Sequence, residues 1–199
     1  MDLSIYFAGL ASLMVIVDPI GTALVFHSLV PPDDKKFRLK MAFKSVLIAT
    51  SLLLLFGLYG EPFLNMLGVS IHAFRISGGI LLFFTAFNLI TQEISMVSSN
   101  GNSDISVYPM AIPMMAGPGS LTLAILLFSQ SEKAEADIAV AAAILTITLA
   151  TLCCMLLSRY IKRVIGRTGD DILRRFLGVI LAALAIQFIY DGIVNITAG

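Results

Sequence analysis

The sequence has few charged residues, no tryptophan and only two cysteines. Of its 199 residues, 13% are charged and 58% are hydrophobic, whereas soluble domains carry roughly 25% charged residues. This composition leaves too little polar surface for a water-soluble enzyme. The 13 Lys and Arg residues balance the 13 Asp and Glu residues, so no net positive field exists to hold a nucleic acid.

The two cysteines, Cys153 and Cys154, are adjacent inside an apolar run. Adjacent cysteines provide neither a disulfide framework nor a spaced metal site, so we expect no metal and no cofactor. A thiol electron carrier would need cysteines on two facing helices, and neighbouring side chains diverge by about 100° around one helix. The sequence also lacks a P-loop, so an ion or substrate gradient, not nucleotide hydrolysis, is the expected energy source.

Long apolar runs dominate the chain instead. A membrane-spanning helix needs about 20 apolar residues, and the mean hydropathy is +0.93. The runs cover residues 3–30, 41–59, 71–91, 107–130, 138–158 and 172–196. We therefore predict an all-α integral membrane protein with one transmembrane domain over residues 1–199. No basic region precedes the first run, so we expect it to be retained and not cleaved as a signal.

Basic residues gather in the connections after the first and fifth runs, whereas only Arg75 and Lys133 lie on the other side of a six-span topology. The positive-inside rule then places both termini outside the cytoplasm. The connection at 92–106 has no basic residue and is expected to be a flexible linker. The basic residues are Lys35, Lys36, Arg38, Lys40, Lys44, Arg159, Lys162, Arg163, Arg167, Arg174 and Arg175.

The third and sixth runs begin alike, which indicates an internal repeat. Arg75-Ile-Ser-Gly78 lines up with Arg175-Phe-Leu-Gly178 at an offset of one hundred positions. Pro19 in the first run and Pro118 in the fourth are offset by ninety-nine, each with a glycine close behind. A repeated unit of three spans enters the membrane from the opposite side, so the two copies are inverted.

These observations predict six transmembrane helices arranged as a 3+3 inverted repeat, with copies at 1–91 and 107–199. In transporters of this kind the ligand site lies near mid-depth, where the repeats meet. We expect spans one to three to rock against spans four to six.

Two of the predicted spans contain helix-breaking residues near their middle. The first contains Asp18-Pro19-Ile20-Gly21-Thr22 and the fourth contains Gly117-Pro118-Gly119-Ser120. Proline removes a backbone donor, and glycine leaves helical angles at little cost. Asp18 lies about 22 Å along the span from Leu3, and Pro118 about 15 Å from Tyr108. Helices one and four are therefore predicted to be interrupted at mid-membrane.

An interruption at this depth exposes peptide groups that protein, water or a ligand must satisfy. The positive end of a half-helix favours a carboxylate, and free carbonyls accept from an ammonium group. A silent proline kink is the alternative for one break, but paired breaks favour a site for a small zwitterion. The predicted substrate-binding residues at the breaks are Asp18, Pro19, Ile20, Gly21, Thr22, Gly117, Pro118, Gly119 and Ser120.

Asp18 is the only acidic residue inside an apolar run away from its ends. A charge at the bilayer centre costs at least about 2.5 kcal/mol on insertion scales, so Asp18 is expected to face a polar cavity or to be protonated. It is a candidate proton carrier. It is also a candidate cap for the half-helix that begins at Pro19, and the two roles are compatible.

Other polar side chains inside the runs are expected mainly to form interhelical hydrogen bonds. They are Ser77, Thr85, Asn88, Thr122 and Gln187. Asn88 and Gln187 hold similar places in the two repeats, so we add both to the predicted substrate-binding residues.

Arg75 and Arg175 begin the third and sixth runs. For these residues we favour snorkelling or a gating salt bridge over contact with substrate. His27 and His72 lie near span ends and are expected to be interfacial.

Four segments of the sequence resemble the MarC family of six-span membrane proteins, over essentially the whole chain. They are Asp18-Pro19-Ile20-Gly21, Arg75-Ile-Ser-Gly-Gly79, Pro109-Met-Ala-Ile-Pro113-Met-Met-Ala-Gly117-Pro118-Gly119 and Gln187-Phe-Ile-Tyr-Asp191-Gly192. The family is also called the neutral amino acid transporter family and is grouped with lysine-exporter-like carriers. The resemblance implies a bacterial or archaeal inner-membrane carrier of small neutral amino acids such as glycine and alanine, coupled to protons.

The chain departs from the family pattern at two positions beside the first break. Thr22 and Leu24 stand where the family often has Asn and a second proline. These changes leave the break intact and bear on the shape of the pocket.

The leading interpretation is a secondary transporter working by alternating access. An efflux carrier for another small polar metabolite is the nearest alternative. An intramembrane aspartyl protease is disfavoured because its two carboxylates must share a proton, whereas Asp170 and Asp191 are about 30 Å apart along the sixth run.

Overall fold

The computed structural model describes residues 2–31, 34–91, 104–131 and 134–197, and within these ranges all regular structure is helical. Residues 92–103 of the linker expected at 92–106, and Lys133, lie outside the described residues. The elements are α1 (Leu3–Val17), α2 (Pro19–Leu29), α3 (Lys35–Met66), α4 (Ile71–Thr91), η1 (Ser106–Met115), α5 (Pro118–Ser129), α6 (Ala134–Leu156) and α7 (Ser158–Thr197).

Five segments of the described chain are long and apolar enough to cross a membrane: Leu3–Leu29, Lys35–Met66, Ile71–Asn88, Ala134–Leu156 and Arg175–Thr197. The pair η1 and α5 makes a sixth when its two parts are counted as one span, bent by 55°. The all-helical, multi-span fold is therefore confirmed. The inverted 3+3 relation between the halves stays a prediction.

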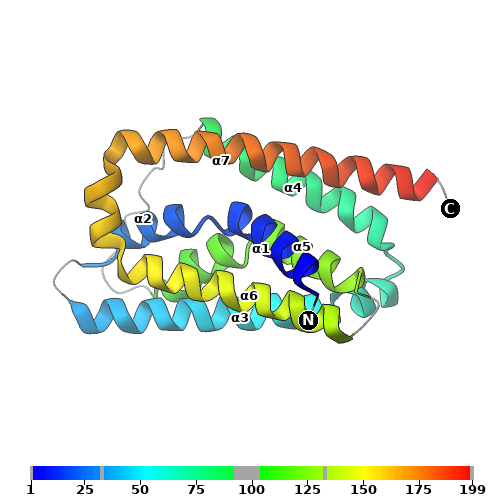
Figure 1. Ribbon diagram of the computed structural model, residues 1–199, viewed down its shortest axis with the longest axis horizontal. Helices are drawn as coiled ribbons and strands as arrows, with labels where there is room; N and C mark the ends of the chain where they lie inside the picture. The colour runs from blue at the N-terminus through cyan, green and yellow to red at the C-terminus, as the bar shows by residue number, and fades with distance from the viewer. Residues whose placement is uncertain (1, 32–33, 92–103, 132–133, 198–199) are drawn as a thin grey trace.

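The helices form two unequal groups (Figure 1). Most buried apolar side chains belong to one cluster contributed by α1, α2, α3, η1, α5 and α6. A smaller cluster, made of Leu82 and Ala86 of α4 with Leu181 and Ala185 of α7, joins the other two helices. α4 and α7 each bury 22% of the residues in their spanning windows, against 50% for the first span. The α4–α7 pair therefore lies at the edge of a larger bundle.

Glycine lets the backbones of α4 and α7 touch. A Cβ at Gly79 would lie 2.8 Å from the carbonyl oxygen of Ala185 and 2.7 Å from the side chain of Ile189. A Cβ at Gly192 would lie 2.9 Å from the carbonyl oxygen of His72. Small residues at helix crossings allow this approach, and in a membrane the resulting van der Waals contact drives association.

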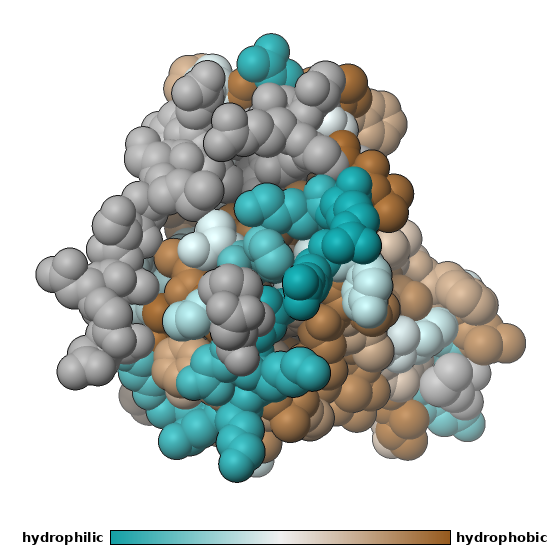
Figure 2. Space-filling model, turned by 90° about the vertical axis from the view of Figure 1, so that its left-hand side faces the viewer, coloured by the Kyte–Doolittle hydropathy of each residue, from teal (hydrophilic) through white to brown (hydrophobic). Residues whose placement is uncertain are grey.

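Polar groups gather at one end of the molecule. The first turns of α3, with Lys35 and Lys36, and of α7, with Arg159 and Lys162, lie at this end, and Figure 2 shows hydrophilic side chains across it. The start of α1 and the end of α7 lie at the opposite end. The two basic connections thus share one side, as six spans require.

A polar contact joins α3 to the chain before η1 at the basic end. Lys44 forms an ion pair with Asp104, which also accepts hydrogen bonds from Ser106. The hydrogen bonds from Lys44 and Ser106 lower the pKa of Asp104 to about 2. The carboxylate is therefore charged at neutral pH.

Two span boundaries differ from the sequence prediction. The segment after the fifth run was expected to be a polar connection, but α7 is helical from Ser158 onward, and its first part crosses the end of the bundle (Figure 1). α3 extends beyond the apolar run 41–59 at both ends. Apolar runs mark only the segment in hydrocarbon, whereas a helix continues into the headgroup region wherever its side chains are solvated.

Gly79→Ala is expected to destabilise the protein by about 1–3 kcal/mol, because the added methyl group meets the backbone of α7 and α4 must shift away. Ser77→Ala, on the exposed side of α4, is the matched control and should change stability by less than about 0.5 kcal/mol. Thermal unfolding in detergent, followed by circular dichroism, measures both. Equal unfolding temperatures for the two variants would contradict the close packing of α4 on α7.

Candidate functional site

The first break lies where the sequence predicted it, between α1 and α2. Asp18 ends one helix and begins the next, with φ 43° and ψ 76° in the left-handed region, which Asp tolerates better than most residues. Its Oδ1 atom accepts a hydrogen bond of 2.9 Å from the backbone N–H of Gly21. A Cβ at Gly21 would lie 2.1 Å from Asp18 Oδ2, so glycine is needed beside this cap.

The chain also satisfies a carbonyl that the first break exposes. The hydroxyl of Thr22 donates to the carbonyl oxygen of Val17 at 2.9 Å, and the Thr22 side chain is almost fully buried. The backbone N–H of Thr22 donates to the carbonyl oxygen of Asp18. Asp18 therefore caps the half-helix, as one of its two predicted roles requires. The hydroxyl of Thr22 is already hydrogen-bonded to a backbone carbonyl.

The second break follows an irregular helical segment. In η1 the N–H of Met110 bonds the carbonyl of Ile105 and the N–H of Ala116 bonds that of Ala111, each five residues back. The residues before its two prolines, Tyr108 and Ile112, have extended angles, and both peptide bonds to proline are cis. η1 then meets α5 at an angle of 55°. The predicted interruption of the fourth span is thus confirmed.

At the second break, as at the first, a side-chain hydroxyl donates to a backbone carbonyl that the break exposes. Ser120 donates to the carbonyl oxygen of Met115 at 2.7 Å and to that of Gly117 at 3.1 Å. However, no side chain caps the N-terminus of α5. The two breaks therefore differ: α2 begins on a carboxylate of the chain itself, whereas no side chain in the described part of the chain accepts from the amides that begin α5.

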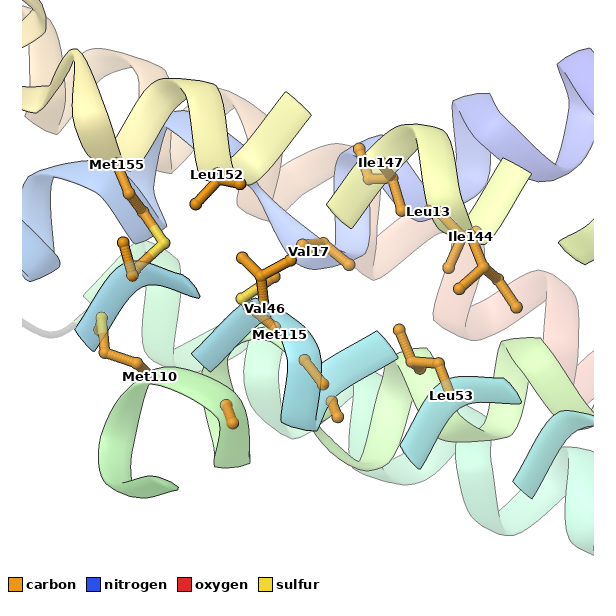
Figure 3. Close-up of a cluster of buried hydrophobic side chains, with 14 of the residues drawn as sticks. Leu13, Val17, Val46, Leu53, Met110, Met115, Ile144, Ile147, Leu152 and Met155 are labelled. Carbon is orange, nitrogen blue, oxygen red and sulfur yellow. The ribbon is translucent and has the colours of Figure 1, made fainter. Parts of the chain in front are cut away.

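The two breaks lie close together in the bundle. Val17 and Met115, which precede them, belong to the same buried cluster (Figure 3). A Cβ at Gly119 would lie 3.4 Å from Ile16 of α1 and 2.2 Å from Leu82 of α4. Leu82 is fully buried and covers the second break from the side of the α4–α7 pair.

Several predicted residues lie away from this meeting point. Gln187 is exposed on α7 and donates to Oδ1 of Asp191 at 2.8 Å. Asn88 is half-buried, about 9 Å beyond Leu82 along α4. Arg75 is half-buried and Arg175 exposed, and in the part of the chain that the structure describes neither forms an ion pair.

The expected interhelical hydrogen bonds are wrong for three hydroxyl groups. Ser77, Thr85 and Thr122 donate to the carbonyls of Phe74, Leu81 and Pro118 within their own helices. A helix presents a carbonyl three or four residues back, so a hydroxyl without a facing polar partner bonds there.

Among the described residues, the histidines and cysteines belong to no cluster that could hold a metal ion. The Nδ1 atoms of His27 and His72 are buried without a hydrogen-bond partner among the described residues. Cys153 and Cys154 are free thiols on α6, and Cys154 is close enough to Asp18 for an electrostatic interaction.

A cavity opens near the end of the molecule where α1 starts. It measures about 180 Å³ and is lined by Ile5, Ala8, Leu127, Gln130 and Ser131. Ala8 lies about 15 Å along α1 from the first break. The sequence did not indicate this cavity, because its lining comes from α1 and from the far end of α5.

Comparison with known proteins assigns the family. The sequence model described as "MarC family integral membrane protein" matches residues 3–197. The chain belongs to the MarC family. A UPF0056 membrane protein of Methanocaldococcus jannaschii is 33% identical over 98% of this chain and 89% of its own. A UPF0056 membrane protein of Escherichia coli is 31% identical over 100% of this chain and 96% of its own. No solved structure matches.

The MarC family assignment confirms the resemblance carried by the four sequence segments. It also makes the chain a multi-pass integral membrane protein with relatives in bacteria and archaea. The names of these relatives give the membrane location and no substrate.

Asp18→Ala is expected to lower stability by about 1–2 kcal/mol, because the cap on Gly21 is lost. Asp18→Asn should change it far less, because an amide oxygen can accept the same hydrogen bond and Asn tolerates the left-handed region. Thermal unfolding in detergent compares the two variants with the natural protein. Equal losses in both would show that the carboxylate charge, and not capping, stabilises the first break.

Proposed function

We propose that this MarC-family protein is a secondary transporter of small neutral amino acids, such as glycine and alanine, which works by alternating access. The observation that carries the proposal is the difference between the two adjacent breaks. One half-helix begins on the carboxylate of Asp18, and the other, α5, has no side-chain cap. Together they offer a place for a positive group and a place for a negative group.

The N-terminus of α5 is suited to the carboxylate of such a substrate. The amides of Gly119 and Ser120 lie at the positive end of the helix, where an anion is stabilised by the N–H groups and by the helix dipole. Gly119 has no side chain to hold a ligand away from the backbone. The ammonium group would then lie toward Asp18, which interacts with cations as a carboxylate.

The packing suggests which parts move. Rocking of 1–91 against 107–199 would have to separate α4 from α7, whose backbones touch at Gly79 and Gly192. We propose instead that the α4–α7 pair moves as a unit against the larger bundle. Movement of Leu82 away from Gly119 would open the second break, and its return would close the break again.

Asp18 is the candidate for proton coupling. Protonation would remove the charge that attracts the ammonium group and would weaken the cap on Gly21, since a neutral carboxyl group is the poorer acceptor. Proton binding and substrate release would then be linked at one residue. An electrogenic or pH-driven flux would follow from this linkage.

An efflux carrier for another small polar metabolite uses the same site and differs only in the solute. Intramembrane proteolysis has no comparable support, because its two carboxylates must share a proton, whereas Asp18 accepts from the N–H of Gly21 and Asp191 accepts from Gln187. A thiol electron carrier is disfavoured because both cysteines lie on α6.

In proteoliposomes, the purified protein is expected to give saturable counterflow of radiolabelled glycine or alanine that responds to an imposed pH gradient. Asp18→Asn keeps the cap but cannot carry a proton, so its flux should lose the pH response. Liposomes without protein, and the natural protein with the ionophore nigericin, are the controls.

Absence of saturable flux for every neutral amino acid tested would reject the substrate class. Full pH-driven flux in Asp18→Asn would reject Asp18 as the proton carrier and leave it as a cap alone.

Replacing Cys153 and Cys154 together by alanine is expected to leave glycine or alanine flux within about twofold of the natural protein, because small apolar substitutions at such positions change stability little. Loss of flux in the double variant, together with flux of the natural protein that depends on a reducing agent, would instead indicate thiol chemistry.

A further inference from the structure

The contact between α4 and α7 brings a basic and an acidic residue to the same depth. A Cβ at Gly192 would lie 2.9 Å from the carbonyl oxygen of His72 and 3.3 Å from the backbone N of Ile76. Arg75 lies in this turn of α4, and Asp191 immediately precedes Gly192. The two helices touch at the backbone here, so the two charged side chains start from neighbouring turns.

Each charged residue lies within one turn of a residue that contacts the bundle. Arg75 is one turn before Gly78, whose Cα packs against Thr122 of α5. Asp191 is one turn after Phe188, which packs against the main buried cluster. Residues three or four apart on a helix lie near one face, and Asp191 also meets the exposed Gln187, so Arg75 and Asp191 lie at the edge between the α4–α7 pair and the bundle.

Asp191 has a hydrogen-bond partner, but within the described ranges it forms no ion pair with Arg75. Gln187 donates to Oδ1 of Asp191 at 2.8 Å, which leaves Oδ2 for another donor. Both residues are half-buried, and within the described ranges no ion pair involves either. An unneutralised charge within a span is costly, so a solute that brings both signs of charge would stabilise the pair.

We propose that Arg75 and Asp191 form a recognition site for zwitterions, in which Arg75 binds the carboxylate and Asp191 binds the ammonium group. The proposal rests on the proposed function for its substrate class and adds the residues that select it. The planar guanidinium group of arginine matches a carboxylate with two parallel hydrogen bonds. Gln187 orients the carboxylate of Asp191.

This site is distinct from the breaks. Arg75 lies about 10 Å from Leu82 along α4, toward the end where α1 starts. A solute from that side therefore meets the two charges before it reaches Leu82. A solute with a single charge leaves either Arg75 or Asp191 unpaired, so the site selects electroneutral solutes. The sequence favoured snorkelling or a gating salt bridge for Arg75 over contact with substrate, and the position of Asp191 is our reason for proposing substrate contact instead.

Single-charge probes test the two halves of the site separately. Glycine, propionate and propylamine are titrated against the purified protein in nanodiscs, and binding is read as the rise in unfolding temperature. Arg75→Gln should lose the response to propionate and keep the response to propylamine. Asp191→Asn should do the reverse, and each variant should bind glycine roughly tenfold or more weakly.

Matched controls separate this result from a general loss of charge. Arg163→Gln, near the basic end, and Glu61→Gln, on α3, remove the same charges elsewhere and should leave all three titrations unchanged. If Arg75→Gln does not fold, Arg75→Lys serves in its place, because it keeps the charge and loses the two-point geometry. It should bind glycine at an affinity between those of the natural protein and Asp191→Asn.

The outcomes also distinguish this proposal from the proposed function. Glycine flux in proteoliposomes combined with unchanged probe binding in both variants overturns the site and leaves the transport function standing. The predicted reciprocal losses without any flux support the site and reject the transport function. If the natural protein responds to none of the three probes, the site is overturned.

Discussion

Peptide groups cannot remain unpaired in hydrocarbon, and the two helix breaks are arranged around that constraint. The carboxylate of Asp18 and the hydroxyls of Thr22 and Ser120 satisfy groups that a continuous helix would satisfy itself. Each of these contacts is short and local, so both breaks can lie inside the main buried cluster. Among the described residues no side chain caps the amides that begin α5, so the peptide groups at the two breaks are satisfied in different ways.

α4 connects the breaks to the rest of the protein. Its two adjacent glycines face different partners: Gly78 packs against Thr122 of α5, and Gly79 packs against the backbone of α7. Leu82, one turn further on, covers Gly119. α4 therefore contacts both the second break and α7. The same helix carries Arg75, so the proposed zwitterion site and the residue that covers the second break belong to one element.

The sequence located both breaks because proline and glycine act on the backbone wherever they stand. It also found the capping role of Asp18, since an acid followed by proline is a local signal. It missed Leu82 and the cavity beside Ala8, whose roles depend on contacts between helices far apart in the sequence. It misjudged the hydroxyls of Ser77, Thr85 and Thr122 because whether a hydroxyl meets a facing helix or turns to its own backbone depends on helix rotation.

The sequence by itself determined the apolar spans, the class of fold, the interruptions and the family, because each follows from composition, local backbone chemistry or a linear motif. Only the tertiary structure decided that α4 pairs with α7 and not with the helices of its own half, which brings Gly192, next to Asp191, against the turn of α4 that carries Arg75. The contacting residues of α4 and α7 are more than one hundred positions apart along the chain. Their contact depends on how close two backbones can approach, which the arrangement of glycines permits but does not specify.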